Sequence, residues 1–318
     1  MSLLSRVANH FYWFGRYVER AENTARLIIA YANLALDLPR SSRLEWYSLV
    51  ETTGSDAAFH KAAHKPTELG VMRFLIEDRE NPGSIVSSLR FARENLRSTR
   101  DRVPREVSES MNLLYGFVHD RSDTAIRRTA ERYEVLRGVV DRCQLVRGYI
   151  GGTMTHGLGY QFIRTGRMLE RADMTTRIMD VRLDDLLPAG AELPPAFDAL
   201  QWMAVLRSLS AYQMYRRQSH GAVRARSVID FLLLQEDFPR SVSYCLTKLR
   251  SGLSTLPRSE QAVATVSALG GQVAGLRGAV LSSDAEALRA AIDELQRALN
   301  GVHGVIERTY FLPLTEPA

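Results

Sequence analysis

Apolar residues recur three and four positions apart along almost the whole chain, which is the spacing of one face of an α-helix. In the first predicted helix, residues 5–37, this apolar face includes Phe14, Val18 and Ala21. We find no segment in which apolar and polar residues alternate as they do in a half-buried strand. The pattern therefore predicts an all-α protein, a helical bundle.

Further helices are predicted wherever the spacing continues between residues that break helices. Their ranges are 43–64, 66–77, 83–102, 104–119, 123–152, 157–187, 196–219, 223–235, 240–256, 259–280 and 284–311. The breaks include Pro66, Pro104, Pro257 and the glycine pair at 151–152. Proline lacks the backbone N–H that continues a helix, so helices are expected to end before it or begin at it.

Two segments of the first half return in the second half in the same order. GRYVERAENTAR at 15–26 and GRMLERADMTTR at 166–177 share seven of twelve residues at an offset of 151. FLIEDRENPGSIVSSLRFAR at 74–93 matches FLLLQEDFPRSVSYCLTKLR at 231–250 at an offset of 157. Ordered matches at a nearly constant offset indicate an internal repeat.

The repeat predicts that residues 1–155 and 156–318 are two helical units packed as one compact body. Copies of one unit commonly pack around a pseudo-twofold axis, because each then covers the apolar face of the other. The two leading helices, predicted at 5–37 and 157–187, are expected to meet near that axis. Glu19 should then lie close to the segment 166–177.

The repeated helix carries a polar face that we call the Arg–Glu stripe. On a helical wheel its members share one face in each copy: Arg16, Glu19, Arg20, Asn23 and Arg26 in the first, and Arg167, Glu170, Arg171 and Arg177 in the second. Most of the remaining surface of the helix is apolar, so the stripe is expected to face the interior. Met174 stands where the first copy has Asn23, so the copies need not be equivalent.

Two interpretations of the stripe stay open. It can be a structural network of ion pairs that joins the two halves, with Glu19 accepting from Arg16 one turn earlier. It can also be a cleft in which arginine side chains bind a carboxylate or phosphate. A carboxylate-bridged metal site is disfavoured, because arginines crowd the acidic residues and no Glu-x-x-His is present.

The second repeated block supplies secondary candidates for a site. In NPGS, Asn81 can cap a helix and Pro82 can occupy its first position. The start of such a helix presents unpaired N–H groups to an anion. Ser84, Arg93 and Asn95 belong to this helix and are candidates to contribute to a site near the stripe.

Composition narrows the function classes. Apolar residues make up 45% of the 318-residue chain and charged residues 24%, as in soluble globular proteins. Two cysteines, Cys143 and Cys245, are too few for a disulfide scaffold and fit a reducing compartment. The chain lacks a phosphate-binding GxxxxGK[ST] loop, a signal-peptide core and an 18-residue apolar run, so we expect a cytoplasmic protein without membrane spans or cofactors.

The opening SRVANHFYWFGRYVERAENTARLI, with NP-x-S-I and AREN downstream, resembles the alpha-E family over essentially the whole chain. This bacterial all-helical family is named for its Glu-Arg motif, which corresponds to Glu19-Arg20 and, in the repeat, to Glu170-Arg171. Its members are encoded beside, or fused to, circularly permuted ATP-grasp-like ligases. The resemblance implies a partner of that type and a part in making or modifying a peptide or amide.

Three hypotheses follow. The first is an accessory or substrate-binding component of an ATP-grasp-type ligase that holds an anionic small molecule or peptide between the repeats. The second is a stand-alone enzyme of peptide or amide modification with Glu19 or Glu170 as general base, which neighbouring arginines oppose by lowering the carboxyl pKa. The third, nucleic-acid binding, is suggested by a pI near 9.3, but 36 acidic residues are mixed with the basic ones, so we expect no nucleic-acid partner.

Overall fold

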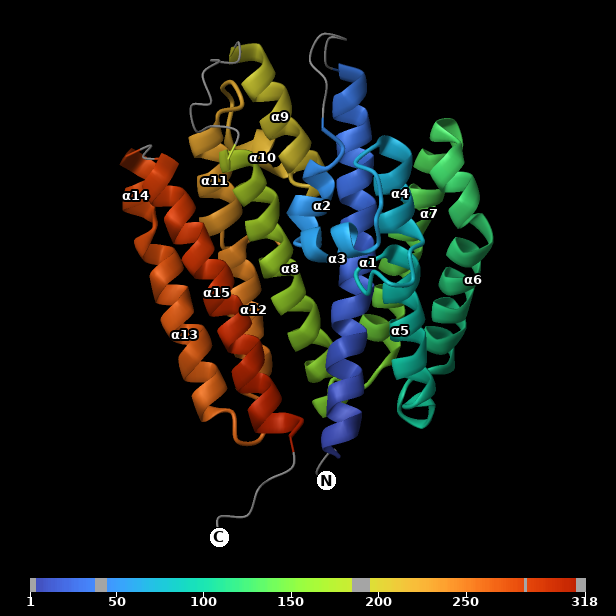
Figure 1. Cartoon of the computed structure of the whole chain (residues 1–318). Helices are drawn as coiled ribbons and strands as arrows, with labels where there is room; N and C mark the ends of the chain where they lie inside the picture. The colour runs from blue at the N-terminus through green and yellow to red at the C-terminus, as the bar shows by residue number, and fades with distance from the viewer. Residues whose placement is uncertain (1–3, 38–44, 185–194, 283–284, 313–318) are drawn as a thin grey trace.

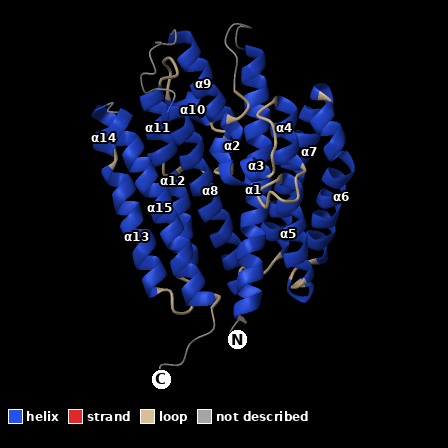
Figure 2. Cartoon of the chain, in the orientation of Figure 1, coloured by secondary structure: helices blue, strands red, loops and turns tan. Residues whose placement is uncertain are grey.

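The computed structural model describes residues 4–37, 45–184, 195–282 and 285–312, and within these ranges it is built of helices without strands. Figure 2 shows helices joined by short loops. The all-α prediction is confirmed. Residues 43–44, 185–187 and 284, which the predicted helices include, lie outside the described residues.

Two long helices form the centre of the molecule, α1 (Ser5–Asp37) and α8 (Leu158–Asp184). They lie side by side and make the most extensive contact between any two elements (Figure 1). Both carry the repeated segment, and both are buried along much of their length. The expectation that the two leading helices meet is confirmed for the described residues.

The central helices approach closely because each has a glycine at the contact. A Cβ atom on Gly15 would lie 2.1 Å from the backbone oxygen of Ile163. A Cβ atom on Gly166 would lie 2.0 Å from the backbone oxygen of Tyr12. No side chain fits at either position, so these glycines set the distance between α1 and α8.

Two groups of helices flank the central pair (Figure 1). On one side, α5 (Ile85–Arg97) and α7 (Thr129–Thr153) contact α1, and α6 (Arg105–Arg127) packs against both of them. On the other side, α12 (Val242–Leu253) and α15 (Ala285–Tyr310) contact α8, and α13 (Glu260–Gly275) packs against both of them. Apolar residues from all of these helices form one continuous core.

Shorter elements complete the described part of the chain. They are α2 (Ser48–Thr53), α3 (Asp56–Lys61), α4 (Glu68–Ile76), the short 3-10 turn η1 (Arg100–Arg102), α9 (Pro195–Ser208), α10 (Tyr212–Gln218), α11 (Ala225–Leu234) and α14 (Arg277–Ser282). Helix α2 lies against α8, although it follows α1 in the chain.

Several predicted helices differ from those in the structure. The single helix predicted at 43–64 is wrong, because Gly54 has a φ of 63° and ends α2. The helix predicted at 196–219 is likewise divided, at Ser210, whose φ is 52°. The helix predicted at 104–119 instead continues to Arg127, because Gly116 lies within α6 without ending it and no proline follows in this part of the chain.

Candidate functional site

The Glu19 carboxylate is the centre of a closed cluster of charges. It is fully buried and accepts hydrogen bonds from Arg171 through Nε (2.8 Å) and Nη2 (2.9 Å). Arg147 of α7 donates to it at 2.9 Å, and Arg240 donates at 3.0 Å from the loop before α12. Burial by itself raises the carboxyl pKa, but the three guanidinium groups outweigh it and hold the pKa of Glu19 well below its usual range.

The same cluster includes Glu22, one turn further along α1. The groups that bond or pair with its carboxylate at 2.7–2.9 Å come from Arg26, Gln144, Arg147 and Arg240. Arg240 also donates to the side-chain oxygen of Asn23 at 2.7 Å. We call Glu19, Glu22, Asn23 and the arginines that bond them the closed cluster. Its charges are paired in the interior, which is the arrangement expected of a structural network.

The Glu170 carboxylate, on α8, is bonded from α1. Arg16 donates through Nε at 2.7 Å, and Arg20 donates through Nε at 2.5 Å and Nη2 at 3.1 Å. Burial by itself raises the pKa of the Glu170 carboxyl group, but the positive charges of Arg20 and Arg16 have the larger effect and lower this pKa to about 2. The prediction that Arg16 pairs with Glu19 is wrong: the two helices are close enough for Arg16 to reach across to Glu170.

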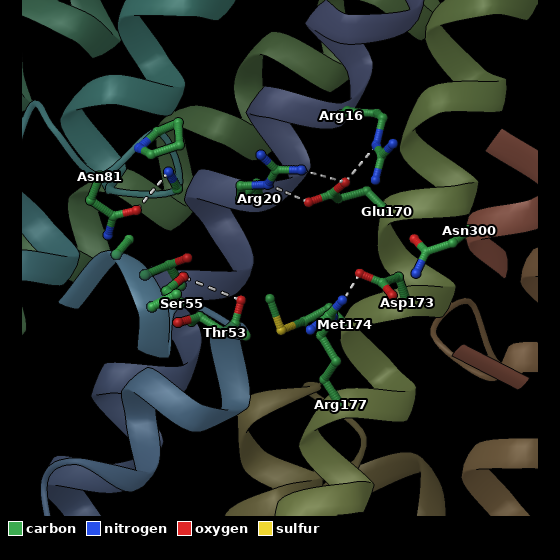
Figure 3. Close-up of a pocket in the computed structure, with 16 residues that line it drawn as sticks. Arg16, Arg20, Thr53, Ser55, Asn81, Glu170, Asp173, Met174, Arg177 and Asn300 are labelled. Carbon is green, nitrogen blue, oxygen red and sulfur yellow. Dashed lines mark hydrogen bonds and ion pairs between the residues drawn. The ribbon is translucent and has the colours of Figure 1, made fainter. Parts of the chain in front are cut away.

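Glu170 faces a pocket of about 380 Å³ between α1, α8 and the loops around α2, α3 and α5 (Figure 3). The residues that line it are Arg16, Arg20, Thr24, Thr53, Gly54, Ser55, Ala57, Ala58, Asn81, Pro82, Gly83, Glu170, Asp173, Met174, Arg177 and Asn300. Arg177 donates to Asp173 at 2.9 Å on the α8 side. Three guanidinium groups and two carboxylates thus give the lining a net charge of +1.

Local structure explains how the loops reach this pocket. Gly54 is needed there because a Cβ atom at this position would lie 2.2 Å from Nη1 of Arg177, besides its positive φ. Asn81 fixes the loop before α5, since its side chain accepts from the backbone N–H of Gly83 at 2.9 Å and donates to the backbone oxygen of Phe74 at 3.0 Å. Ser84 caps α5 by accepting from the backbone N–H of Ser87, so the prediction that Asn81 caps this helix and Pro82 begins it is wrong.

The structure separates the other candidates from the pocket. Arg93 donates to Asn112 at 2.7 Å, and the side chains of Asn95 and His10 are hydrogen-bonded at 2.9 Å. Neither Arg93 nor Asn95 lines the pocket. Arg167 does not bond Glu19 as Arg16 bonds Glu170. Its Nε is buried and has no hydrogen-bond partner among the described residues, and burial lowers its pKa to about 10.

Three members of the closed cluster, Glu22, Arg147 and Arg240, were not among the predicted site residues, and neither was Gln144, which bonds Glu22. Gln144 and Arg147 lie on α7, where their sequence resembles that of an ordinary polar helix face. A signal existed for Arg240, because it directly follows Pro239 in the second repeated block. In the alignment of the two blocks Arg240 pairs with Gly83, and because these residues differ, the repeat did not indicate a role for this position.

The chemistry of the site favours binding over proton transfer. The pKa of Glu170 is about 2 and that of Glu19 lies well below its usual range, so both carboxylates hold protons too weakly to act as efficient general bases near neutral pH. Burial raises the pKa of Cys245 to about 12 and that of Cys143 well above its usual value, so neither thiol is an activated nucleophile. No group of His, Cys, Asp and Glu in the described ranges is arranged to hold a metal ion.

Comparison with known proteins gives the family. A family model described as "a predicted alpha-helical domain with a conserved ER motif" matches residues 3–311. The chain belongs to the Alpha-E family. Two ER pairs of this Alpha-E chain, Glu19-Arg20 on α1 and Glu170-Arg171 on α8, bond each other. Arg20 donates to Glu170, and Arg171 donates to Glu19.

Relatives of this Alpha-E chain include uncharacterized proteins of Mycobacterium bovis and Mycobacterium tuberculosis. One protein of M. bovis and one of M. tuberculosis are each 25% identical to it over 278 residues, which is 80% of this chain and 30% of each relative, and a further M. tuberculosis protein is 24% identical over a segment of the same length. The chain therefore spans about a third of the length of these relatives. No solved structure matches it. None of the helices that the structure describes has the length and apolar character of a membrane span.

Proposed function

We propose that this Alpha-E chain is a binding module that holds an anionic group, a carboxylate or a phosphate, in the pocket beside Glu170. The observation that carries the proposal is the position of three guanidinium groups around one cavity. In the part of the chain that the structure describes, Arg16 and Arg177 bond carboxylates through Nε. Arg16 also hydrogen-bonds Tyr12, and the Nη atoms that these bonds do not use remain as donors in the planar geometry that suits carboxylate and phosphate.

The size and lining of the pocket support a small ligand. About 380 Å³ lies in the range of small-molecule sites, which start near 300 Å³. Ala57, Ala58, Pro82 and Met174 add apolar surface to the same lining. A ligand with one anionic end and a short organic part, such as an acidic amino acid, a short acidic peptide or an acyl-phosphate, fits these features.

The proposal includes an internal duplication, with residues 1–155 and 156–318 as repeats related by a pseudo-twofold axis. Reciprocal contacts support it. Arg20 bonds Glu170, and Arg171 bonds Glu19, at equivalent positions of the repeated segment. The glycine contacts between α1 and α8 are reciprocal in the same way. On this view the pocket lies between the repeats, with lining from both.

We propose that the chain acts as an accessory component of an ATP-grasp-type ligase. It would bind an anionic substrate and present it to the ligase, or receive it from the ligase. Support comes from the resemblance on the residues of the opening helix and from the length of the mycobacterial relatives, about 70% of which lies outside the matched segment. Co-purification of the full chain with an ATP-grasp-like protein from the same source under native conditions is expected. Absence of any such complex would contradict this part of the proposal.

Isothermal titration tests the binding role itself, with inorganic phosphate, citrate and the dipeptide Glu-Glu as probes. We expect at least one probe to bind the chain and Arg177→Gln to weaken it about tenfold, which corresponds to the loss of one charged contact. Arg97→Gln is the matched control, because Arg97 belongs to an exposed pair on α5 outside the pocket. Equal affinity in both variants, or no binding of any probe, would contradict the proposal.

A further inference from the structure

The loops that precede α5 and α12 have the same backbone arrangement. In the first, Ser84 donates its N–H to the oxygen of Asn81 at 3.1 Å; in the second, Ser241 donates to the oxygen of Phe238 at 3.0 Å. The hydroxyl of each serine then caps its helix by accepting a backbone N–H at 3.1 Å. Position 83 in one loop therefore corresponds to position 240 in the other.

The side chains at these two positions differ completely. Arg240 extends from its loop into the closed cluster, where Nη1 donates to Glu19 at 3.0 Å and Nη2 donates to Glu22 at 2.8 Å. It is 6% exposed and fills the space beside the Glu19 carboxylate. Gly83 has no side chain, and the corresponding space beside Glu170 is the pocket.

A side chain at position 83 would meet no backbone obstacle. A Cβ atom there would lie 3.2 Å from Oδ1 of Asn81 and 3.9 Å from Oγ of Ser55, and Gly83 does not have a positive φ. Glycine is therefore not required by the local conformation of the loop. Because glycine has no side chain, the space beside position 83 stays open.

A second difference concerns the acceptors around that space. Asn23, which accepts from Arg240 at 2.7 Å, corresponds in the repeat to Met174, which lines the pocket without a carbonyl oxygen to offer. Both oxygens of Glu170 are already bonded by Arg16 and Arg20. The pocket thus lacks the arginine that occupies its counterpart and the acceptor that Asn23 supplies there. Asp173, which corresponds to Glu22, also lines the pocket, and among the described residues its buried Oδ1 has no hydrogen-bond partner, so it is available to accept from a guanidinium group at position 83.

We propose that Gly83 keeps the ligand pocket open and that Arg240 is a built-in occupant that closes the corresponding space in the other repeat. The chain then binds one anionic ligand, on the Glu170 side only, while the Glu19 side serves stability. This inference rests on the proposed function, since it names the residue that determines access to the same pocket.

Substitution at position 83 tests the inference. Gly83→Arg is expected to fold, to place a guanidinium group in the pocket and to weaken binding of the best probe among phosphate, citrate and Glu-Glu by about tenfold or more. Gly83→Ala is the matched control, for which we expect less than about a threefold change. The wild-type stoichiometry should be one. Binding by Gly83→Arg that equals the wild type, or two equivalent sites in the wild type, would overturn the inference.

Two measurements decide the inference even when no probe binds, an outcome that would contradict only the proposed function. A crystal structure of Gly83→Arg should show the new side chain inside the pocket, and an arginine directed to solvent would overturn the inference. In Arg240→Gly, millimolar ethylguanidinium should raise the thermal unfolding midpoint by occupying the vacated space, whereas the wild type and Arg97→Gln should show no such rise. Equal responses in all three proteins would also overturn it.

Discussion

Replacement of Glu19 by glutamine tests the closed cluster most severely. Glu19→Gln removes one negative charge and leaves Arg147, Arg171 and Arg240 around a neutral amide. The side chains of these arginines are at most 10% exposed, so water cannot replace the lost partner. The amide also brings an NH2 group, which cannot accept from a guanidinium group.

The expected magnitude follows from this burial. Removal of one partner from a buried ion pair costs about 3–5 kcal/mol. Because Glu19 serves three cations, we expect a loss of about 5 kcal/mol in the free energy of unfolding, a large part of the stability of a typical domain. Glu170→Gln should cost less, about 2–3 kcal/mol, since Arg20 is 23% exposed at its side chain and adjoins the pocket.

Urea denaturation followed by far-UV circular dichroism measures these differences. Glu109→Gln is the matched control, because Glu109 forms an exposed pair on α6 and such pairs contribute little. The order of destabilisation should be Glu19→Gln, then Glu170→Gln, then the control. If Glu19→Gln is as stable as the control, the closed cluster does not stabilise the fold and the structural assignment of Glu19 fails.

Three further outcomes are expected. Gly15→Ala should destabilise the protein by about 3 kcal/mol or more, while Gly148→Ala, whose Cβ meets open space, should stabilise it by about 0.5–1 kcal/mol; equal unfolding midpoints would contradict the close contact of α1 and α8. The lowered pKa of Glu170, about 2 against 4.5, contributes stability that is complete above pH 4.5 and is lost as the pH falls toward 2. Thermal midpoints of Glu170→Gln should therefore decline less than wild type over that range, and parallel curves would refute this. Cys143 and Cys245 should resist Ellman's reagent in the native protein and react only in denaturant, and rapid native labelling would contradict their burial.

The sequence is sufficient to predict the all-α class and the contact between the repeated helices, because both depend on helical periodicity and on a polar stripe that must face inward. It was insufficient at Gly54 and Ser210, where a positive φ divides helices that periodicity joins. It was also insufficient for Arg147 and Arg240, since their roles depend on which helix packs beside Glu19. A cleft along the Arg–Glu stripe is one of the two interpretations that the sequence allows, but the position of the pocket beside Glu170 could not be predicted, because it depends on the absent side chain of Gly83.

The most direct test of the account is the position of a bound anion. Crystals of the full chain soaked in selenate, an anomalous scatterer with the charge and shape of phosphate, should give an anomalous peak in the pocket. The peak should lie within hydrogen-bond distance of Nη atoms of Arg16, Arg20 or Arg177, with none beside Glu19. Occupancy beside Glu19, or only on the outer surface, would contradict the claim that the pocket beside Glu170 is the anion site.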